Sequence, residues 1–368
     1  MQGKDSISAL GGKATQNSSN VVYFIRLKKG QSRLDCFEHL LDRIDTYLSE
    51  YKKGSFTGIK MTVGDKKSTG YIRPELVRKL VENLNAKGAK PFVFDTNVIY
   101  TGPRQNAVDH LNLAYIKGFT PDNLGCPYII ADGLFGTDSK IIKVDFKNVK
   151  EIRVPSLVGV LEDLVVLTHI TGHIMSGYAG SIKNVCMGMA SRAGKQVQHS
   201  SLKPAINPEN CTMCGYCMEM CPVSAISEAS GKTFINSKLC IGCGECISAC
   251  KFNAVTINWS EDVDVFVERM AEYACGILSQ IKRKIFINFA FDITEECDCI
   301  SGDDPRIAED TGIFASEDIL AVDKACFDML TKGKDIFSRN KKKKAYLHQF
   351  KYAEGIGLGG LDYELIEL

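Results

Sequence analysis

Eight cysteines between residues 211 and 250 constrain this chain more than any other feature of its sequence. They form two runs of equal spacing, Cys211-x-x-Cys214-x-x-Cys217-x-x-x-Cys221 and Cys240-x-x-Cys243-x-x-Cys246-x-x-x-Cys250. This doubled pattern supplies thiolates for two [4Fe-4S] clusters, and the fourth cysteine of each run ligates the other cluster. One cluster is therefore expected on Cys211, Cys214, Cys217 and Cys250, and the second on Cys240, Cys243, Cys246 and Cys221. Zinc sites, which pair cysteines across longer gaps, fit the pattern badly.

The residues around both runs agree with cluster binding. Gly215 and Gly242 allow the backbone to turn tightly around a cluster. The repeated spacing predicts two halves related by a pseudo-two-fold axis. Lys251 stands where the first run has Pro222, and a positive charge there favours the reduced cluster and raises its potential.

The composition of the whole chain limits the other classes of function. The 368 residues suffice for one large and one small domain, or for two ordinary domains. A net charge of +1, from 45 basic and 44 acidic side chains, gives no sign of a nucleic-acid or acidic-membrane partner. No apolar stretch is long enough for a transmembrane helix. Residues 1–19 are polar, and we expect a flexible leader without a secretory signal. Fifteen cysteines without such a signal favour a reducing cytoplasmic location.

The sequence outside the cysteine runs alternates between strand and helix patterns. Strands are predicted at residues 21–25, 58–63 and 91–95, with helices at 35–51 and 74–87 between them. This order is typical of β-α-β units with parallel strands. Further predicted strands are 128–131, 141–144, 152–154, 164–168 and 285–290, and further predicted helices are 263–281 and 316–332.

The position of the cysteine runs predicts an insertion. We expect an α/β fold in which residues 20–200 and 261–368 form one discontinuous, mostly parallel-sheet host domain. Residues 201–260 would form an inserted small α+β ferredoxin-like domain with two clusters. The alternative of three consecutive domains leaves the C-terminal part with too few strands for a sheet of its own.

Two groups of polar residues in the host domain are candidates for a site. Asp95 and Asn97 follow a predicted strand, where loops of a parallel sheet form the ligand crevice. An ordinary capped helix start is the alternative. The second group contains two histidines, which can move protons or bind metal, and cations that can hold an anion. It consists of His169, His173, Lys183, Asn184, Arg192 and Lys195. The alternative is that these histidines are structural.

A third candidate is the segment Cys297-Asp298-Cys299, which follows the predicted strand 285–290. Two cysteines at this spacing can hold a metal or the edge of a cluster, or form a redox pair. Two free thiols in a reducing cytoplasm are the alternative.

Several strings outside the cysteine runs carry a resemblance to a known family. They are Tyr71-Ile72-Arg73-Pro74-Glu75, Asp95-Thr96-Asn97, Thr168-His169, Gly172-His173, Lys183-Asn184, Met187-Gly188, Ser191-Arg192-Ala193-Gly194-Lys195, Cys297-Asp298-Cys299, and Ser316-Glu317-Asp318 with Asp323. Together they resemble the domain-of-unknown-function 362 family of uncharacterised iron–sulfur-centre proteins with a ferredoxin insert. The resemblance extends from about residue 20 to the C-terminus and implies the family's fold and clusters. Where family members carry lysine before Gly-His, this chain has Thr171.

These patterns lead to one main functional hypothesis and two alternatives. The main hypothesis is an iron–sulfur oxidoreductase that passes electrons between a redox partner protein, its clusters and a host-domain site. That site would be lined by histidine, lysine and cysteine and would hold a small anionic substrate or cofactor. A flavin or an additional metal is a further candidate cofactor, although no motif identifies one. The alternatives are a non-enzymatic electron carrier or assembly factor that docks a partner, and a non-redox enzyme with structural clusters.

Overall fold

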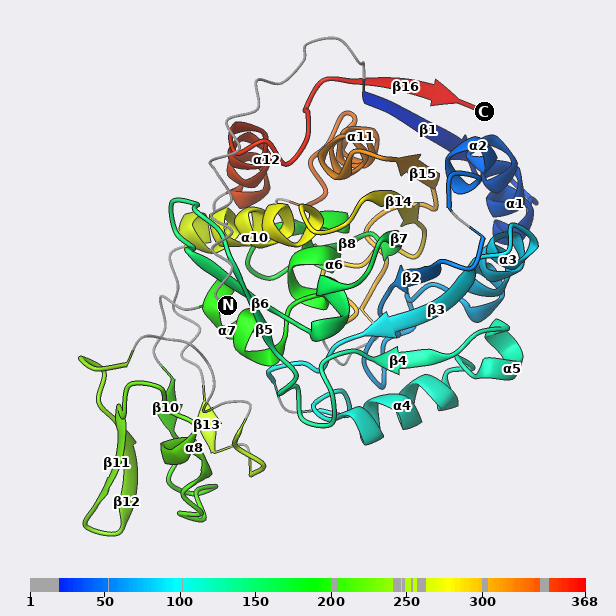
Figure 1. Ribbon diagram of the computed structural model, residues 1–368. Coiled ribbons are helices and arrows are strands. Elements are labelled where there is room, and N and C mark those ends of the chain that lie inside the picture. The colour runs from blue at the N-terminus through cyan, green and yellow to red at the C-terminus, as the bar shows by residue number, and fades with distance from the viewer. Residues whose placement is uncertain are drawn as a thin grey trace, which may run out of the picture.

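One large sheet with helices on both faces dominates the architecture, and a small cysteine-rich segment lies at its side (Figure 1). The computed structural model describes residues 20–51, 53–100, 102–199, 204–240, 246, 249–252, 254–256, 263–299, 304–337 and 344–368. The predicted leader at 1–19, Gly242 and Cys243 lie outside the described residues.

The main sheet is mostly parallel, as the α/β prediction requires. Its strands, in spatial order, are β16 (Tyr363–Glu367), β1 (Asn20–Arg26), β15 (Gly312–Ser316), β14 (Arg283–Ala290), β7 (Asp163–His169), β2 (Phe56–Lys60), β3 (Lys90–Asp95) and β4 (Tyr128–Ile130). Only β15 runs against its neighbours, β1 and β14, and every other pairing is parallel. The carboxyl ends of β2, β3, β7 and β14 therefore meet at one edge.

The sequence of β7 shows why this sheet has helices on both faces. All seven of its residues are buried. Leu164 and Val166 belong to one hydrophobic core, and Val165 and Leu167 belong to the other. A strand that is buried on both faces requires a cover on each side, which in parallel sheets is supplied by crossover helices.

The helices divide between these two cores. The core around Val165 includes buried residues of α1 (Arg33–Arg43), α2 (Asp45–Leu48), α3 (Pro74–Ala86), α4 (Ala107–Ile116) and α5 (Pro121–Leu124). The core around Leu164 includes residues of α6 (Ser181–Gly188), α10 (Val263–Leu278), α11 (Ile319–Thr331) and α12 (Ala345–Gly355), and α7 (Arg192–Gln198) packs against α10. The described helices include none long and apolar enough to cross a membrane.

Local signals explain where several predicted elements begin and end. Pro74 occupies the first turn of α3, and Gly88 follows this helix with φ of 80°. The predicted helix 35–51 is interrupted at Ile44, which separates α1 from α2. The predicted strand 58–63 is shifted, since β2 begins at Phe56 and ends at Lys60.

Two short hairpins and a 3-10 turn of the host region lie outside the main sheet. The strands predicted at 141–144 and 152–154 exist as β5 (Lys140–Lys143) and β6 (Glu151–Val154), but they form a separate antiparallel hairpin. A second hairpin, not predicted from the sequence, pairs β8 (Thr171–His173) with β9 (Gly177–Ala179). A 3-10 turn at Ser156–Gly159 connects β6 to β7.

The cysteine segment, residues 204–256, contributes no strand to the main sheet in its described part. It contains β10 (Ala205–Ile206), α8 (Tyr216–Glu219), β11 (Ile226–Ala229), β12 (Lys232–Ile235) and β13 (Val255–Thr256). The strands pair as β10 with β13 and β11 with β12. The main sheet takes strands from both sides of this segment in the sequence, namely β1–β4 and β7 before it and β14–β16 after it.

Candidate functional site

A cavity of about 520 Å³ lies at the carboxyl edge of the main sheet. Lys60, Asp95 and His169 are the last residues of β2, β3 and β7, and all three line the cavity. This edge is the usual ligand crevice of an open parallel sheet. The volume falls within the range of about 300–1,000 Å³ that is typical of small-molecule sites.

Most of the candidate residues predicted from the sequence come together here. The cavity is lined by the predicted residues Asp95, His169, His173, Lys183, Asn184, Lys195, Cys297 and Cys299. Asn97 and Arg192 are not among the lining residues. The Nδ2 group of Asn97 donates to Asp132 at 2.9 Å and to the Gly133 carbonyl at 2.7 Å, which ties two loops together. Arg192 donates to the carbonyl of Phe135 at 3.3 Å.

Lys60 is a charged cavity residue that was not among the predicted site residues. Its ammonium group lies 3.0 Å from the Asp95 carboxylate and donates to Asn184 Oδ1 at 2.8 Å. Burial lowers the pKa of Lys60, and Asp95 opposes that shift. Burial alone would raise the pKa of Asp95, but Lys60 and other nearby cations lower it overall. A lone lysine between Ile59 and Met61 in a buried strand was the signal available in the sequence.

Positive charge predominates around the cavity. Apart from its histidines, four cationic side chains line it, and two carboxylates do so. The cations are Lys60, Arg104, Lys183 and Lys195, and the carboxylates are Asp95 and Asp298. Burial lowers the pKa of Lys183 and of Lys195 to about 8, because a buried ammonium group loses its hydration. An anionic ligand would restore that lost stabilisation.

His169 and Asp298 form a buried ion pair beside the cavity. His169 Nδ1 lies 2.7 Å from Asp298 Oδ2, and Nε2 lies 2.6 Å from the carbonyl oxygen of Phe291. A carbonyl and an ionised carboxylate only accept hydrogen bonds, so both ring nitrogens carry protons and His169 is an imidazolium. Burial opposes this charge, but Asp298 raises the pKa of His169 overall.

His173 has the opposite character. Its Nδ1 accepts hydrogen bonds from the backbone N–H groups of Met175 and Ser176, at 3.3 and 3.1 Å. Nδ1 is therefore unprotonated and the ring proton is on Nε2. Burial lowers the pKa of His173 well below its ordinary value, so this ring is neutral. A neutral and a cationic histidine thus line the same cavity.

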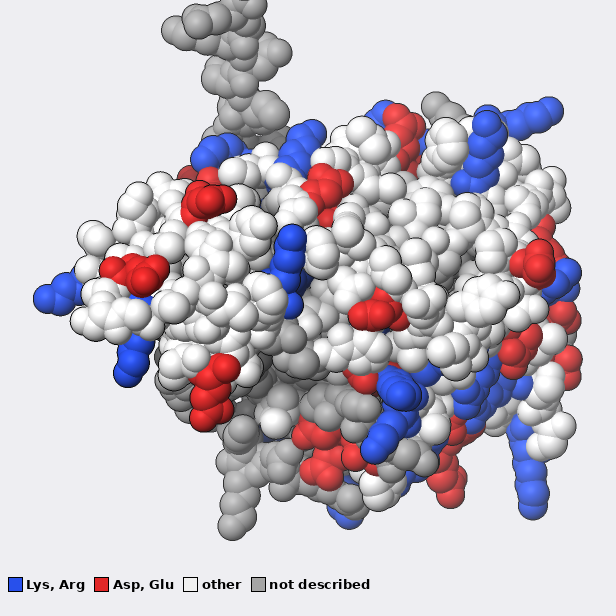
Figure 2. Space-filling view, turned by 90° about the horizontal axis from the view of Figure 1, so that it is seen from below, with Lys and Arg blue, Asp and Glu red and all other residues white. Residues whose placement is uncertain are grey.

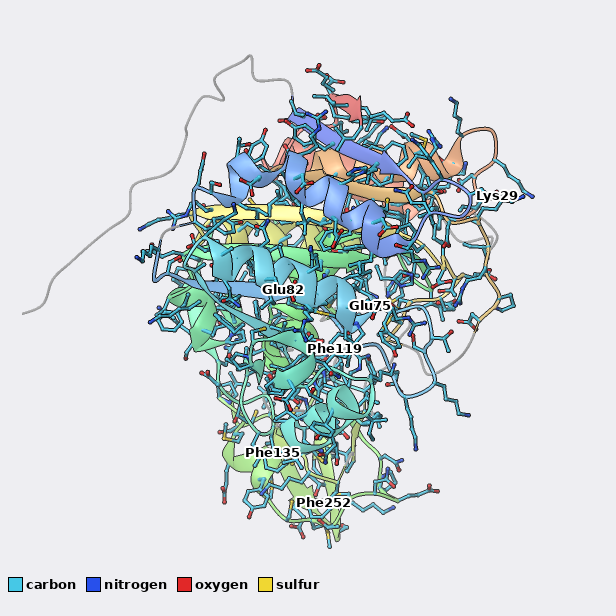
Figure 3. The ribbon with its side chains drawn as sticks, turned by 90° about the vertical axis from the view of Figure 1, so that its right-hand side faces the viewer. Lys29, Glu75, Glu82, Phe119, Phe135 and Phe252 are labelled. Atoms are coloured by element: carbon cyan, nitrogen blue, oxygen red, sulfur yellow. A yellow bond between two sulfur atoms is a disulfide. The ribbon has the colours of Figure 1, made fainter. Side chains whose placement is uncertain are left out.

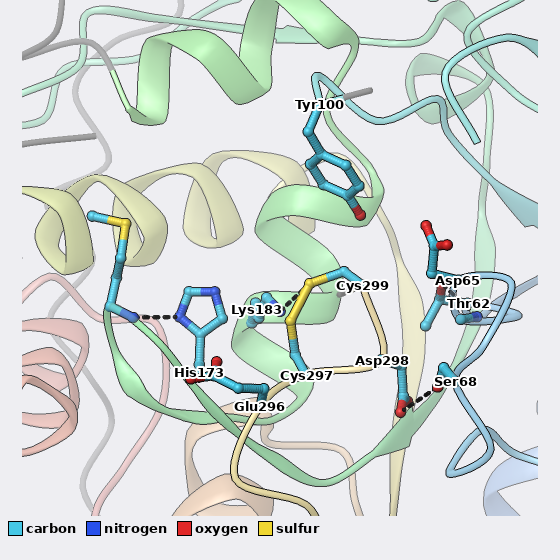
Figure 4. The surroundings of a disulfide bond; sticks show 12 residues. Thr62, Asp65, Ser68, Tyr100, His173, Lys183, Glu296, Cys297, Asp298 and Cys299 are labelled. Carbon is cyan, nitrogen blue, oxygen red and sulfur yellow. Dashed lines mark hydrogen bonds between the residues drawn. A yellow bond between two sulfur atoms is a disulfide. The ribbon is translucent and has the colours of Figure 1, made fainter. Parts of the chain in front are cut away.

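Cys297 and Cys299 are joined by a disulfide at the cavity wall (Figure 4). The structure thus contains neither the pair of free thiols nor the thiolate pair of a metal site that the sequence left open. Lys183 Nζ lies 3.4 Å from Cys299 Sγ. Asp298 lies between the two cysteines and accepts two hydrogen bonds. Its backbone carbonyl accepts one from the N–H of Asp65 at 2.7 Å, and its carboxylate accepts the other from Ser68 Oγ at 3.2 Å.

Four of the predicted cluster ligands also share a cavity of their own. Cys211, Cys214, Cys217 and Cys250 line a small apolar pocket together with residues such as Phe252 and Val255. Burial raises the pKa of Cys217, and the neighbouring Cys250, Cys211 and Cys214 add to this rise. Met213, with φ of 55°, and Gly215, with φ of 81°, turn the backbone between these cysteines.

The second predicted ligand set is only partly described, because Cys243 lies outside the described residues. Cys221 Sγ accepts from the N–H of Ala225 at 3.2 Å, and Cys250 Sγ accepts from the N–H of Ala254 at 3.3 Å. These equivalent contacts in the two runs follow the predicted internal repeat. In the described ranges, no three His, Cys, Asp or Glu side chains converge as the ligands of one ion would. Cubane ligands have no such requirement, since each thiolate binds a different iron atom.

The loop after β3 connects the cysteine segment to the large cavity. Ile99 and Tyr100 line that cavity, and they also pack in a hydrophobic cluster with Cys246, Cys217 and other residues of the cysteine segment. Tyr100 Oη accepts from Arg104 Nη2 at 2.5 Å, and the same nitrogen donates to the carbonyl of Cys299 at 3.4 Å.

A second contact between the cysteine segment and the host region involves Lys251, which stands where the first cysteine run has a proline. Its ammonium group lies 5.3 Å from the ring centroid of Phe135 and 4.9 Å from that of Tyr216. Figure 3 shows Phe135 of the host region above Phe252 of the cysteine segment.

Solved structures of other proteins resemble this chain only at low sequence identity. Two solved structures with a similar backbone are a lactate racemase apoprotein from Thermoanaerobacterium thermosaccharolyticum (13% identity, TM-score 0.40) and a protein from Thermotoga maritima (12% identity, TM-score 0.42). The alignments cover 82% and 79% of this chain, and 54% and 57% of those chains. This chain thus spans little more than half the length of either. None of the curated proteins matches it significantly.

A family model matches residues 57–328, which include the ends of β2, β3 and β7, the cysteine segment and the Cys297–Cys299 pair. The chain therefore belongs to the family described as Domain of unknown function (DUF362).

Proposed function

We propose that this protein is an iron–sulfur oxidoreductase whose host cavity binds a small anionic molecule and exchanges electrons with two [4Fe-4S] clusters. The observation that carries the proposal is the shared loop after β3. Ile99 and Tyr100 contact the cysteine segment on one side and line the charged cavity on the other. The two sites are thus separated by side chains of a single loop.

The cysteine segment supports the electron-transfer part. The eight thiolates would hold the clusters, which when bound supply electrons one at a time. The four described thiols around the small pocket lie in apolar surroundings, and the N–H donors of Ala225 and Ala254 point at Cys221 and Cys250. Hydrogen bonds to cluster sulfur stabilise the more negative, reduced state.

The charges of the large cavity support an anionic ligand. Lys60 lies 3.0 Å from the Asp95 carboxylate, whereas Lys195 Nζ donates hydrogen bonds to the uncharged oxygens of Thr96 and Ala190, at 2.5 and 2.7 Å, and feels the carboxylates of Asp132 and Asp95 without a hydrogen bond to either in the described part of the chain. A carboxylate or phosphate that enters the cavity would pair with Lys195. The Nε2–H of His173 supplies a neutral donor, and a lysine with a pKa near 8 can give up or retain a proton near neutral pH.

The first test is the content of iron, acid-labile sulfide and other metals in protein purified without oxygen. Two clusters predict about eight irons and eight sulfides per chain. Dithionite should bleach the visible absorption, and air should restore it. A preparation with stoichiometric zinc and no sulfide would contradict the proposal.

The second test measures anion binding. Small carboxylates and phosphate esters are screened by thermal unfolding, since a ligand at 100 times its Kd stabilises the native state by about 2.7 kcal/mol. A hit should stabilise the wild type and the surface control Lys282→Gln, but not Lys195→Gln. If the ligand stabilised Lys195→Gln as much as the wild type, the anion would not bind at Lys195, and the cavity would not be the anion site.

A second candidate function is an electron carrier that docks a partner protein. The cysteine segment exposes large apolar side chains, namely Met213, Tyr216, Met220, Val223, Phe234, Leu239 and Phe252. Helix α4 adds exposed Val108, Leu111, Tyr115 and Ile116. Figure 2 views this side of the molecule and shows a broad surface with few charged side chains. The anion-binding screen distinguishes the two functions, because an electron carrier would bind no small anion in the cavity, whereas the proposed oxidoreductase would.

A further inference from the structure

We infer that the Cys297–Cys299 disulfide is a redox-active group that opens to a dithiol within the host cavity, with Lys183 stabilising the Cys299 thiolate. The inference rests on the proposed function, because it names the group of the cavity that takes up electrons. Three independent observations carry it: the position of the disulfide, the cation against one sulfur, and the rigid attachment of the residue between the cysteines.

The disulfide is placed for reaction. Both cysteines line the 520 Å³ cavity, so a small reductant or substrate can approach the S–S bond. The other cysteines of the host region, Cys36, Cys126, Cys186, Cys275 and Cys326, are free thiols, and all but the partly exposed Cys275 are buried. A pair two residues apart closes a very small ring, so it constrains little of the unfolded chain and adds little stability. A structural role is therefore a poor account of its presence.

Lys183 distinguishes the two sulfurs. Its Nζ lies 3.4 Å from Cys299 Sγ, and Cys297 has no such contact among the described residues. A neighbouring ammonium group favours thiolate over thiol. Lys183 comes from α6, and its neighbour Asn184 accepts from Lys60 of β2, so the cation is fixed by the host fold rather than by the disulfide loop.

Asp298 holds the loop in place whether the bond is open or closed. It bonds to Asp65, Ser68 and His169 through separate atoms. The two sulfurs consequently remain near one another after reduction, which allows the bond to form again. Arg104 also donates to the Cys299 carbonyl at 3.4 Å and connects this loop to Tyr100.

The chemical step is a two-electron reduction. The S–S bond accepts two electrons and breaks, one sulfur takes a proton from solvent, and the Cys299 sulfur remains a thiolate beside Lys183 or takes a second proton. A dithiol reductant supplies both electrons and becomes a disulfide itself. A low-potential one-electron carrier supplies them in two successive steps.

The test is a redox titration of the anaerobically purified full chain. The protein is equilibrated at pH 7 with reduced and oxidised dithiothreitol at a series of ratios and quenched with acid. It is then unfolded and labelled with N-ethylmaleimide, and the peptide that contains Cys297 and Cys299 is analysed by mass spectrometry. Cys36 and Cys126 carry label at every ratio and report complete labelling. We expect both cysteines of the pair to gain label together in one transition.

Lys183 variants test the role of the cation. Lys183→Gln should require a ratio of reduced to oxidised dithiothreitol about tenfold higher for half-reduction, because the thiolate loses its nearby charge. Lys183→Arg should restore most of the shift, and the surface control Lys143→Gln should behave as the wild type. An unchanged midpoint in Lys183→Gln would overturn the role of Lys183.

Two results would overturn the redox role itself. They are a pair that is labelled at every ratio, and a pair that stays unlabelled at the most reducing ratio. Iron and sulfide are counted in the same samples. A protein without iron whose pair titrates as expected would contradict the proposed function alone, and an iron-loaded protein with an inert pair would contradict this inference alone.

Discussion

The ammonium group of Lys60 lies 3.0 Å from the carboxylate of Asp95, and these side chains are 1% and 5% exposed. They are the last residues of adjacent parallel strands, β2 and β3. The pair therefore places one positive and one negative charge at the floor of the cavity, where neither is hydrated by bulk water. Removal of one partner leaves the other buried without its nearest opposite charge.

Lys60→Met should destabilise the protein strongly. We expect a loss of about 3–5 kcal/mol in the free energy of unfolding, as for other buried pairs that lose one partner. Urea denaturation measures it. Arg78→Met breaks an exposed ion pair with Glu82, whose side chains are both 52% exposed, and should cost less than about 1 kcal/mol. If the two variants lost similar free energies of unfolding, burial would not explain the stability that the Lys60–Asp95 pair contributes.

The stability of the protein should fall in acid because of His110. This ring is fully buried, its Nε2 lies 3.8 Å from Asp95 Oδ2, and burial lowers its pKa to about 3. An unfolded histidine titrates near pH 6.5, so between these values the unfolded state binds the proton and the native state does not. Stability then decreases as the pH falls from 6.5 towards 3, by up to about 1.4 kcal/mol per pH unit.

His110→Asn should reduce this slope by about one proton. The measurement is the free energy of unfolding in urea at pH 6.5, 5.5 and 4.5. His173, whose pKa is also lowered by burial, acts in the same direction, so the variant should retain part of the slope. A variant whose profile runs parallel to that of the wild type would assign the acid sensitivity to other groups.

Gly172 should not tolerate a side chain. A Cβ atom there would lie 2.0 Å from the carbonyl oxygen of Glu295, a backbone atom that cannot move aside cheaply. Gly172→Ala should therefore lower the thermal midpoint and displace the loop that leads to Cys297. Gly355→Ala is the matched control, because a Cβ there meets no atom within 4 Å and Gly355 is a residue of α12, where glycine is less favourable than alanine by up to about 1 kcal/mol. Equal effects of both substitutions would contradict the close approach.

Asn97→Ala should affect stability rather than ligand binding. Asn97 bonds to Asp132 and Gly133 and does not line the cavity. Leaving those buried partners unsatisfied costs about 1–3 kcal/mol. The concentration dependence of thermal stabilisation by an anionic ligand should stay that of the wild type once the lower baseline is subtracted. If Asn97→Ala bound the anionic ligand much more weakly than the wild type, Asn97 would have to be counted among the ligand-binding residues.

The sequence was informative where the pattern is local. The strand periodicity at 91–95 and 164–168 located β3 and β7, and Pro74 and Gly88 marked the limits of α3. The crevice residues followed, because residues after parallel strands must share one edge. The antiparallel insertion of β15 between β1 and β14 had no local signal, since pairing partners far apart in sequence are chosen by the packing of the whole sheet.

The composition of the site was harder to predict than its location. Lys60 reads as an ordinary strand-end lysine until Asp95 of the neighbouring strand is placed beside it. Arg192 and Asn97 carry the same side-chain groups as true lining residues, and only their orientation towards Phe135 and Asp132 separates them. Such distinctions depend on side-chain direction, which spacing in the sequence does not determine.

Residues 95–100 and 102–104 form the carboxyl end of β3, part of the cavity wall and the surface on which the cysteine segment packs. Any substitution in this loop that improves one of these surfaces changes the others, so the three cannot vary independently over evolution. A cysteine segment taken from another protein could be transplanted onto this host only together with a loop that matches it. The unit that can be exchanged between proteins therefore includes the loop after β3 as well as the cysteine segment, and it is not defined by the positions where the segment begins and ends in the sequence.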